Sequence, residues 1–113
     1  MYAQLTFFDG PRSDEMVRAS RRAGQERIAP AMQADPHMRD QLVEVYVLNQ
    51  PNGAEVVITL VKTEEALRHS EQVIMSTQLL PGEDPGLLPG PDRVEVYQVT
   101  ARADSSAQLT TIE

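Results

Sequence analysis

Residues 42–61 show the most regular alternation of apolar and polar positions in the chain. β-Branched or other apolar side chains recur at every second position from 43 to 48 and again from 56 to 61. A period of two with β-branched residues predicts two strands. Asn52-Gly53 between them predicts a tight turn, because both residue types tolerate positive φ. The stretch therefore predicts a β-hairpin at the centre of the fold.

Two turns fit this hairpin, and they give different strand registers. A two-residue loop pairs Val47 with Ile58 and makes one face of the hairpin wholly apolar. Pro51 has no N–H for the strand ladder and fits better at the second position of a type I turn followed by a Gly53 bulge. That register sets Tyr46 opposite Ile58. The pattern favours the first register, with Ile58 in the subunit core; a slip of one residue exchanges the faces.

Four further elements follow from the pattern on either side of the hairpin. They are strands over residues 2–8 and 93–100 and helices over residues 13–32 and 63–78. Ser13 and Thr63 are the expected helix N-caps, and Pro30 is expected to kink the first helix or to begin a new turn. Residues 80–92 hold four prolines and three glycines, which predicts a long loop.

The predicted order is strand, helix, strand, strand, helix, strand, which is the split βαβ, ferredoxin-like arrangement (βαββαβ). We therefore predict an α+β fold over residues 1–100, with both helices on one face of a four-stranded antiparallel sheet. Residues 101–113 form a polar tail, which is expected either to be disordered or to act as a swapped edge strand.

One face of each predicted strand is wholly apolar and suits the side covered by helices. It consists of Ala3, Leu5, Phe7, Val43, Val45, Val47, Val56, Ile58, Leu60, Val94 and Val96. The opposite, mixed face consists of Tyr2, Gln4, Thr6, Phe8, Tyr46, Leu48, Val57, Thr59, Val61, Tyr97 and Val99. This second face is still too apolar for water, and a contiguous patch of that kind usually marks an interface. We therefore predict a homodimer built on it.

The composition narrows the classes of partner and location. The net charge is −7, from 17 acidic and 10 basic residues, and an acidic chain without a basic stripe does not suit a nucleic acid. There is no apolar run of membrane length and no signal-peptide pattern in the first residues, so we expect a cytoplasmic protein without a membrane partner. The chain has no Cys and no Trp, which leaves no thiolate site and few side chains to stack on a planar cofactor.

Several motifs resemble the antibiotic biosynthesis monooxygenase-like family. They are Ile28-Ala29-Pro30-Ala31 late in the first helix, the two central strands, the segment 60–67 that runs from a strand into a helix starting Glu-Glu-Ala, and the closing strand at 94–99. The resemblance covers residues 2–100. It implies a dimeric α+β barrel, in which two ferredoxin-like sheets pack face to face. Known members include cofactor-free oxygenases of polyphenols and haem-degrading enzymes.

The chain departs from the family at positions that matter for its chemistry. Many members have a Trp at the end of the third strand, where residues 60–63 read LVKT, and haem-degrading relatives use an Asn in the first strand, where this chain has Gln4 and Thr6. Haem degradation is therefore not expected, and neither is any cofactor. The resemblance implies a cofactor-independent monooxygenase or related small enzyme acting on an aromatic or polyketide-like metabolite. The alternative is a non-catalytic dimeric module that binds a small molecule or acts as a scaffold.

His69 is the candidate catalytic base, at the edge of the inner face of the second helix. An imidazole takes a phenolic proton near neutral pH; the alternative is a boundary residue half exposed to solvent. His37 is placed in a loop after Asp35-Pro36 and is given no role. The histidines and carboxylates lack the spacing of metal-binding motifs, so no metal is expected.

Arg27 falls on a helix stripe of small side chains, where a guanidinium needs a partner or an anion. We expect it either to bind the carboxylate or phenolate of a ligand between helix and sheet, or to reach the rim of that layer. Ser20 and Gly24 lie on the same stripe, and their small size leaves room for a ligand. Glu44 and Glu95 are the acids of the sheet considered as internal partners of Arg27.

Tyr46, Tyr97, Gln4 and Thr59 form a polar and aromatic set on the mixed face. They are expected either to line a cavity for a small aromatic ligand or to form the core of the dimer interface, with their polar groups satisfied across it. The loop at residues 81–91 is expected to act as a lid or as a connection that contacts the partner subunit.

Overall fold

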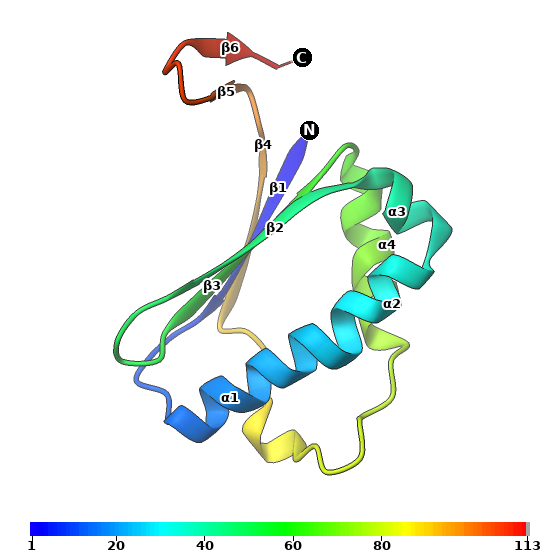
Figure 1. Ribbon diagram of the computed structural model, residues 1–113, viewed down its shortest axis with the longest axis vertical. Helices are drawn as coiled ribbons and strands as arrows, with labels where there is room; N and C mark the ends of the chain where they lie inside the picture. Colours follow the sequence, from blue (N-terminus) through cyan, green and yellow to red (C-terminus); the bar gives the residue numbers. More distant parts are fainter. Residues whose placement is uncertain (113) are drawn as a thin grey trace.

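The computed structural model describes residues 1–112 and shows an α+β domain with its helices on one side of a sheet (Figure 1). The sheet consists of β1 (Tyr2–Phe8), β2 (Leu42–Asn49), β3 (Glu55–Val61) and β4 (Arg93–Gln98). All neighbouring strands are antiparallel and their order is β2-β3-β1-β4, which is compatible with the predicted ferredoxin-like arrangement. In the described part of the chain, no helix is both long and apolar enough to cross a membrane.

The helical layer is longer and more segmented than the two predicted helices. It comprises α1 (Asp14–Arg22), the π-helical turn η1 (Ala23–Ile28), α2 (Ala29–Ala34), α3 (Pro36–Gln41) and α4 (Glu64–Met75). Ser13 caps α1 as predicted, because its hydroxyl accepts a hydrogen bond from the Met16 backbone N–H at 3.1 Å. Thr63 occupies the N-cap position of α4 without a side-chain cap bond.

The π-helical turn η1 lies directly before Pro30. A proline lacks the N–H of an α-helical bond, and its ring clashes with the carbonyl four residues earlier, here that of Glu26. In the wider turn the Ala29 N–H donates to the Gly24 carbonyl, which relieves this conflict. Pro30 then lies in the first turn of α2, where proline is favoured. Ile28 and Ala29 keep right-handed helical backbone angles, so the helix continues through this change of hydrogen bonding and no separate helix begins at Pro30.

The helix α3 is absent from the predicted elements, because Asp35-Pro36 is typical of a helix end. In the structure Asp35 instead caps α3 by accepting the Met38 backbone N–H at 3.0 Å, and Pro36 takes the first helical position. His37 therefore lies in a helix and not in the expected loop. Met38 is fully buried at the centre of the core, which holds this short helix in place.

The β2–β3 hairpin has the register that Pro51 favours, so the preferred register is wrong. Tyr46 lies opposite Ile58. The Gly53 N–H donates to the Gln50 carbonyl at 2.9 Å, which places Pro51 at the second position of the turn. Gly53 has a φ of 89°, the left-handed conformation that glycine adopts most readily. The backbone limits of a proline and a glycine therefore outweigh the alternation of the strands.

A β-bulge at Val43 further shifts the residues of β2. Leu42 lies opposite Val61 whereas Glu44 lies opposite Leu60, so Val43 is the extra residue. Beyond the bulge, Val45 and Val47 lie on the side of the helices, and Tyr46 lies on the other side. A bulge of this kind interrupts alternation, and the sequence gives no sign of its position.

Cross-strand pairs assign the sheet residues to faces, and the predicted assignment is wrong for β1 and β3. The side toward the helices consists of Tyr2, Gln4, Thr6, Phe8, Leu42, Val45, Val47, Val57, Thr59, Val61, Val94 and Val96. On this side Tyr2 and Val61 pack with Met38 and Leu67 in the core. The error arises because β4 pairs Ala3 with Tyr97, which separates the apolar sets of β1 and β4.

The opposite side of the sheet is strongly apolar, and we call it the open face. It consists of Ala3, Leu5, Phe7, Tyr46, Leu48, Val56, Ile58, Leu60 and Tyr97, with Glu44, Arg93 and Glu95 at the outer strands. All helices of the described chain lie on the other side (Figure 1). Tyr46, Leu48 and Tyr97 are 48%, 52% and 53% exposed, so large apolar side chains of this face meet solvent in the single subunit.

The predicted loop between α4 and β4 contains one 3₁₀ turn, η2 (Pro85–Leu87). After β4 the chain forms β5 (Ala101–Ala103) and β6 (Leu109–Thr111), which pair only with each other within the described residues. We call residues 101–111 the C-terminal arm. Figure 1 shows the arm standing away from the helices, beyond the end of the sheet. Residue 113 of the predicted tail lies outside the described residues.

Candidate functional site

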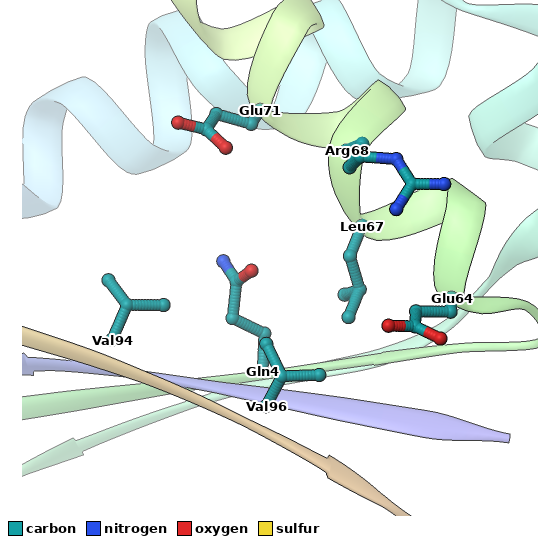
Figure 2. A pocket seen from close by; sticks show the side chains of 7 residues that line it. All are labelled: Gln4, Glu64, Leu67, Arg68, Glu71, Val94 and Val96. Carbon is teal, nitrogen blue, oxygen red and sulfur yellow. The ribbon is translucent and has the colours of Figure 1, made fainter.

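A cleft of about 290 Å³ lies between the sheet and α4, and we call it the α4 cleft (Figure 2). It is lined by Gln4, Glu64, Leu67, Arg68, Glu71, Val94 and Val96. β1 and β4 supply the floor, because Gln4 and Val96 are a cross-strand pair on the helix side. Positions 64, 67, 68 and 71 follow i, i+3, i+4 and i+7 spacing, which puts all four on one face of α4.

Gln4 brings an amide into the floor of the α4 cleft. It is half-buried, and Figure 2 shows its amide pointing from the sheet toward α4, between Val94 and Leu67. None of the side-chain hydrogen bonds within residues 1–112 involves Gln4. A primary amide both donates and accepts hydrogen bonds, so this group is available to a polar atom of a ligand.

Three charged residues of α4 form the rim of the cleft. Glu64, Arg68 and Glu71 are all exposed, and none belongs to an ion pair of the described chain. Figure 2 shows the Glu71 carboxylate on the side of Gln4 and the Arg68 guanidinium extending to the other side of Leu67. These residues are missing from the predicted site, because their role depends on which face of α4 overhangs β4. The spacing of Glu64, Arg68 and Glu71 along the helix was the signal in the sequence that could have identified them as one face.

His69 lies on α4 but not among the lining residues of the cleft. Its Nε2 lies 2.9 Å from Asp35 Oδ1, and its ring meets the His37 ring edge to face at 4.6 Å. The Met38 backbone N–H and then the His69 ring hold the pKa of Asp35 below its usual value. Since Asp35 is also the α3 cap, this contact ties α3 to α4. The arrangement gives His69 a structural partner and no approach to the α4 cleft.

Arg27 is directed into the protein, where its partner is neither Glu44 nor Glu95. Its Nε lies 3.0 Å from Glu83 Oε1, and its Nη1 donates to Thr77 Oγ1 at 2.8 Å. The Arg27 and Glu83 side chains are 14% and 3% exposed. The charge of Arg27 is therefore matched within the chain, and the expected need for a bound anion at this position disappears.

Glu83 connects the Pro/Gly loop to the helical layer. Its Oε1 also accepts the Leu80 backbone N–H at 2.6 Å. This hydrogen bond is the main reason that the pKa of Glu83 lies below its usual value; burial opposes the shift and Arg27 adds to it. Arg22 donates to the Pro81 carbonyl at 2.7 Å. Two arginines thus fasten the loop predicted as a lid to α1 and η1.

Ser20 contacts Arg12, which is not among the predicted site residues. Arg12 Nη2 donates to Ser20 Oγ at 3.0 Å, and the guanidinium lies 5.4 Å from the centre of the Phe8 ring. Its Nε and Nη1 are buried without a hydrogen-bond partner in residues 1–112. The Arg12 backbone N–H donates to Asn52 at 2.8 Å. These contacts join the start of α1 to β1 and to the β2–β3 turn.

The structure divides the predicted polar and aromatic set between the two faces of the sheet. Gln4 and Thr59 are a cross-strand pair on the helix side, whereas Tyr46 and Tyr97 lie on the open face. The Tyr46 hydroxyl donates to the Glu44 carboxylate, and this contact raises the pKa of Tyr46. Only Gln4 of the four lines the α4 cleft.

The remaining part of the described chain offers a second hollow but no metal cluster. The hollow, about 350 Å³, lies at the hairpin end of the sheet and is formed by strand ends of β1, β2 and β3. No helix residue lines it. Across residues 1–112, no three histidine or carboxylate side chains come together to hold a metal ion. Of these two hollows, the α4 cleft is the one formed by both layers of the fold.

Comparison of the chain with protein-family models, with curated proteins and with solved structures finds no match.

Proposed function

We propose that this chain is a homodimeric small-molecule-binding protein of the antibiotic biosynthesis monooxygenase-like type, and that the α4 cleft holds a small aromatic ligand. The observation that carries the proposal is the Gln4 amide, which lies in the α4 cleft beside Val94, Val96 and Leu67 and has no side-chain hydrogen bond within residues 1–112. Ligand sites combine apolar walls with a few polar groups that fix orientation. In this arrangement Val94, Val96 and Leu67 contact a ring, and Gln4 binds a hydroxyl group on it.

The proposed assembly is a ferredoxin-like dimer of the α+β barrel type, closed by two open faces. The support is the apolar character of that face in the subunit: Tyr46, Leu48 and Tyr97 are about half exposed, and contiguous exposed apolar patches mark interfaces. Charged residues lie only on the outer strands of the face, as in interfaces with an apolar core and a polar rim.

Two neighbouring residues of β2 provide a matched test of the assembly. Leu48 lies on the open face and Val47 on the helix side, and they are 52% and 56% exposed. Leu48→Asp places an unpaired charge in the proposed interface and is expected to give a monomer in sedimentation velocity. Val47→Asp is expected to leave the dimer intact. A wild-type chain that sediments as a monomer at micromolar concentration contradicts the proposed assembly.

The ligand site is tested by titrating the protein with phenols, hydroquinones and catechols while recording amide NMR spectra. Shifts are expected to centre on β1, β4 and α4. Gln4→Leu keeps the size of the side chain and removes its hydrogen bonds, so it is expected to weaken binding about fivefold to tenfold. Thr6→Val, also on the helix side of β1, is the control. Binding that ignores Gln4, or shifts elsewhere, contradicts this site.

The chemical role implied by the resemblance is a cofactor-independent monooxygenase. The same ligand panel tests it through oxygen uptake without added metal or cofactor. The alternative, a non-catalytic dimeric module, is favoured by the position of His69, which pairs with Asp35 and does not line the cleft. Binding without oxygen uptake supports this alternative. Oxygen uptake that is lost in Gln4→Leu supports the enzyme.

A further inference from the structure

We propose that the α4 cleft selects ligands by charge: it takes an aromatic molecule that carries an ammonium group and rejects the corresponding carboxylate. This proposal rests on the proposed ligand site and adds the chemical class of the ligand. It differs from the expectation based on Arg27, which pointed to an acidic ligand. Since Glu83 neutralises Arg27, the charges that a ligand meets are those of α4.

The rim of the cleft carries more negative than positive charge. Glu64 and Glu71 face one arginine, Arg68, and none of the three belongs to an ion pair within residues 1–112. The whole chain adds to this potential with a net charge of −7. A ligand with an ammonium group is attracted under these conditions, and one with a carboxylate is repelled.

The positions of the polar groups agree with this charge balance. Figure 2 shows the Gln4 amide and the Glu71 carboxylate facing the same part of the cleft from opposite layers. A carboxylate only accepts hydrogen bonds, whereas an amide both donates and accepts them. A ligand lying between them therefore presents a donor to Glu71, and a group that donates and carries positive charge is the best match.

The apolar side chains determine the rest of the ligand. Val94 and Val96 line the cleft from β4, and Leu67 lines it from α4. This space suits one aromatic ring. The cleft has a volume of about 290 Å³, which lies near the lower limit of small-molecule sites, about 300 Å³. The expected ligand is thus a single-ring phenolic amine and not a polycyclic molecule.

Three ligands that share one ring test the proposal: catechol, a catechol with an aminoethyl group and a catechol with a carboxyethyl group. Dissociation constants are measured by NMR titration on the wild-type protein at low salt. We expect the amine to bind about twofold to fivefold more tightly than catechol, the range of exposed charge pairs, and the acid to bind more weakly. Raising the salt concentration is expected to reduce these differences.

Glu71→Gln tests the contribution of the rim charge, when it is compared with a control that changes the net charge of the protein by the same amount. Glu71→Gln keeps the shape of the side chain and is expected to abolish the preference for the amine, measured as the ratio of the dissociation constants of catechol and of the amine. Glu65→Gln is the matched control, because Glu65 is exposed on the same helix but does not line the cleft. It is expected to keep the preference.

The outcomes distinguish the two proposals. If none of the three ligands shifts the cleft residues, the proposed ligand site fails and the charge selection fails with it. If the acid binds as tightly as the amine or more tightly, the charge selection fails while the ligand site stands. If Glu65→Gln reduces the preference as much as Glu71→Gln does, the net charge of the chain explains it and the role of the rim is overturned.

Discussion

At the scale of single residues, the buried ion pair of Arg27 and Glu83 replaces the anion site that was predicted at Arg27. In the sequence, a guanidinium on a stripe of small residues predicts an anion-binding site. In the fold, a glutamate 56 residues further along the chain meets it at 3.0 Å. Because the pair is enclosed, removing one partner leaves the other as an uncompensated buried charge. The pair therefore holds the Pro/Gly loop on the helices.

Replacing Arg27 with Met tests this reading through thermal stability. Arg27→Met leaves the Glu83 carboxylate unpaired, so we expect the melting temperature to fall by several degrees. The double variant Arg27→Met/Glu83→Gln removes both charges and keeps an acceptor for the Leu80 N–H, so it is expected to recover most of the loss. Arg18→Met, at an exposed position of α1, is the control. A higher melting temperature in Arg27→Met would instead support the hypothesis that Arg27 forms an anion-binding site.

The pH dependence of stability provides a second test of Glu83. The Leu80 N–H, with Arg27, lowers the pKa of Glu83 in the folded chain. A lowered carboxyl pKa contributes stability above the unfolded value, about 4.5, and this contribution is lost as pH falls through the folded pKa. Glu83→Gln is therefore expected to flatten the decrease in melting temperature between about pH 5 and pH 2. Unchanged acid dependence contradicts the role of Glu83.

At the scale of elements, the β2–β3 turn decides which residues face the helices. Pro51 and Gly53 fix a turn that shifts the register by one residue relative to the alternating pattern, and the bulge at Val43 shifts it again. Gly53 also lies close to the loop before α1, where an added Cβ would be 2.5 Å from the Arg12 carbonyl oxygen. The turn is therefore held both by its own backbone and by a tertiary contact.

Gly53→Ala is expected to destabilise the protein by about 1–3 kcal/mol, because Ala is strained at positive φ and its Cβ collides with the Arg12 backbone. Gly90→Ala is the matched control. An added Cβ there meets nothing within 4 Å, so we expect stability to be unchanged or to rise by up to about 1 kcal/mol. Chemical denaturation measures both. Equal effects at the two glycines contradict the assigned turn.

At the scale of the whole molecule, the C-terminal arm has little support within the subunit. β5 and β6 pair only with each other within residues 1–112, and Figure 1 shows them beyond the end of the sheet, away from the helices. Leu109 of the arm is 72% exposed. A two-stranded hairpin is only marginally stable by itself in water. In the proposed dimer, the arm is therefore expected to gain its support from the partner subunit.

Removing residues 101–113 tests the function of the arm. Because β5 and β6 pair only with each other in the described chain, the truncated subunit is expected to keep its far-UV circular dichroism. We expect the dimer to dissociate about tenfold more readily, equivalent to about 1.4 kcal/mol, in sedimentation equilibrium. Exchanging Leu109 for Ser in the full-length chain is expected to give a smaller change in the same direction. A truncated chain that dimerises like the wild type contradicts a role for the arm.

The sequence alone determined the elements that depend on neighbouring residues. Alternation at residues 2–8, 43–48 and 56–61 predicted β1, β2 and β3, since the period of side chains along a strand is local. The cap at Ser13 followed from backbone chemistry in the same way. Gln4 was a candidate binding residue from the sequence as well, as a member of the polar and aromatic set with Tyr46, Tyr97 and Thr59.

Only the tertiary structure decided which side of each strand faces the helices and which charges meet. The bulge at Val43 and the pairing of Ala3 with Tyr97 depend on contacts between distant strands, and a shift of one residue reverses a face. The partner of Arg27 depends on where a loop of prolines and glycines returns to the helices. The α4 cleft exists for the same reason: its two layers come from the first strand, the last helix and the last strand of the sheet, which sequence spacing does not relate.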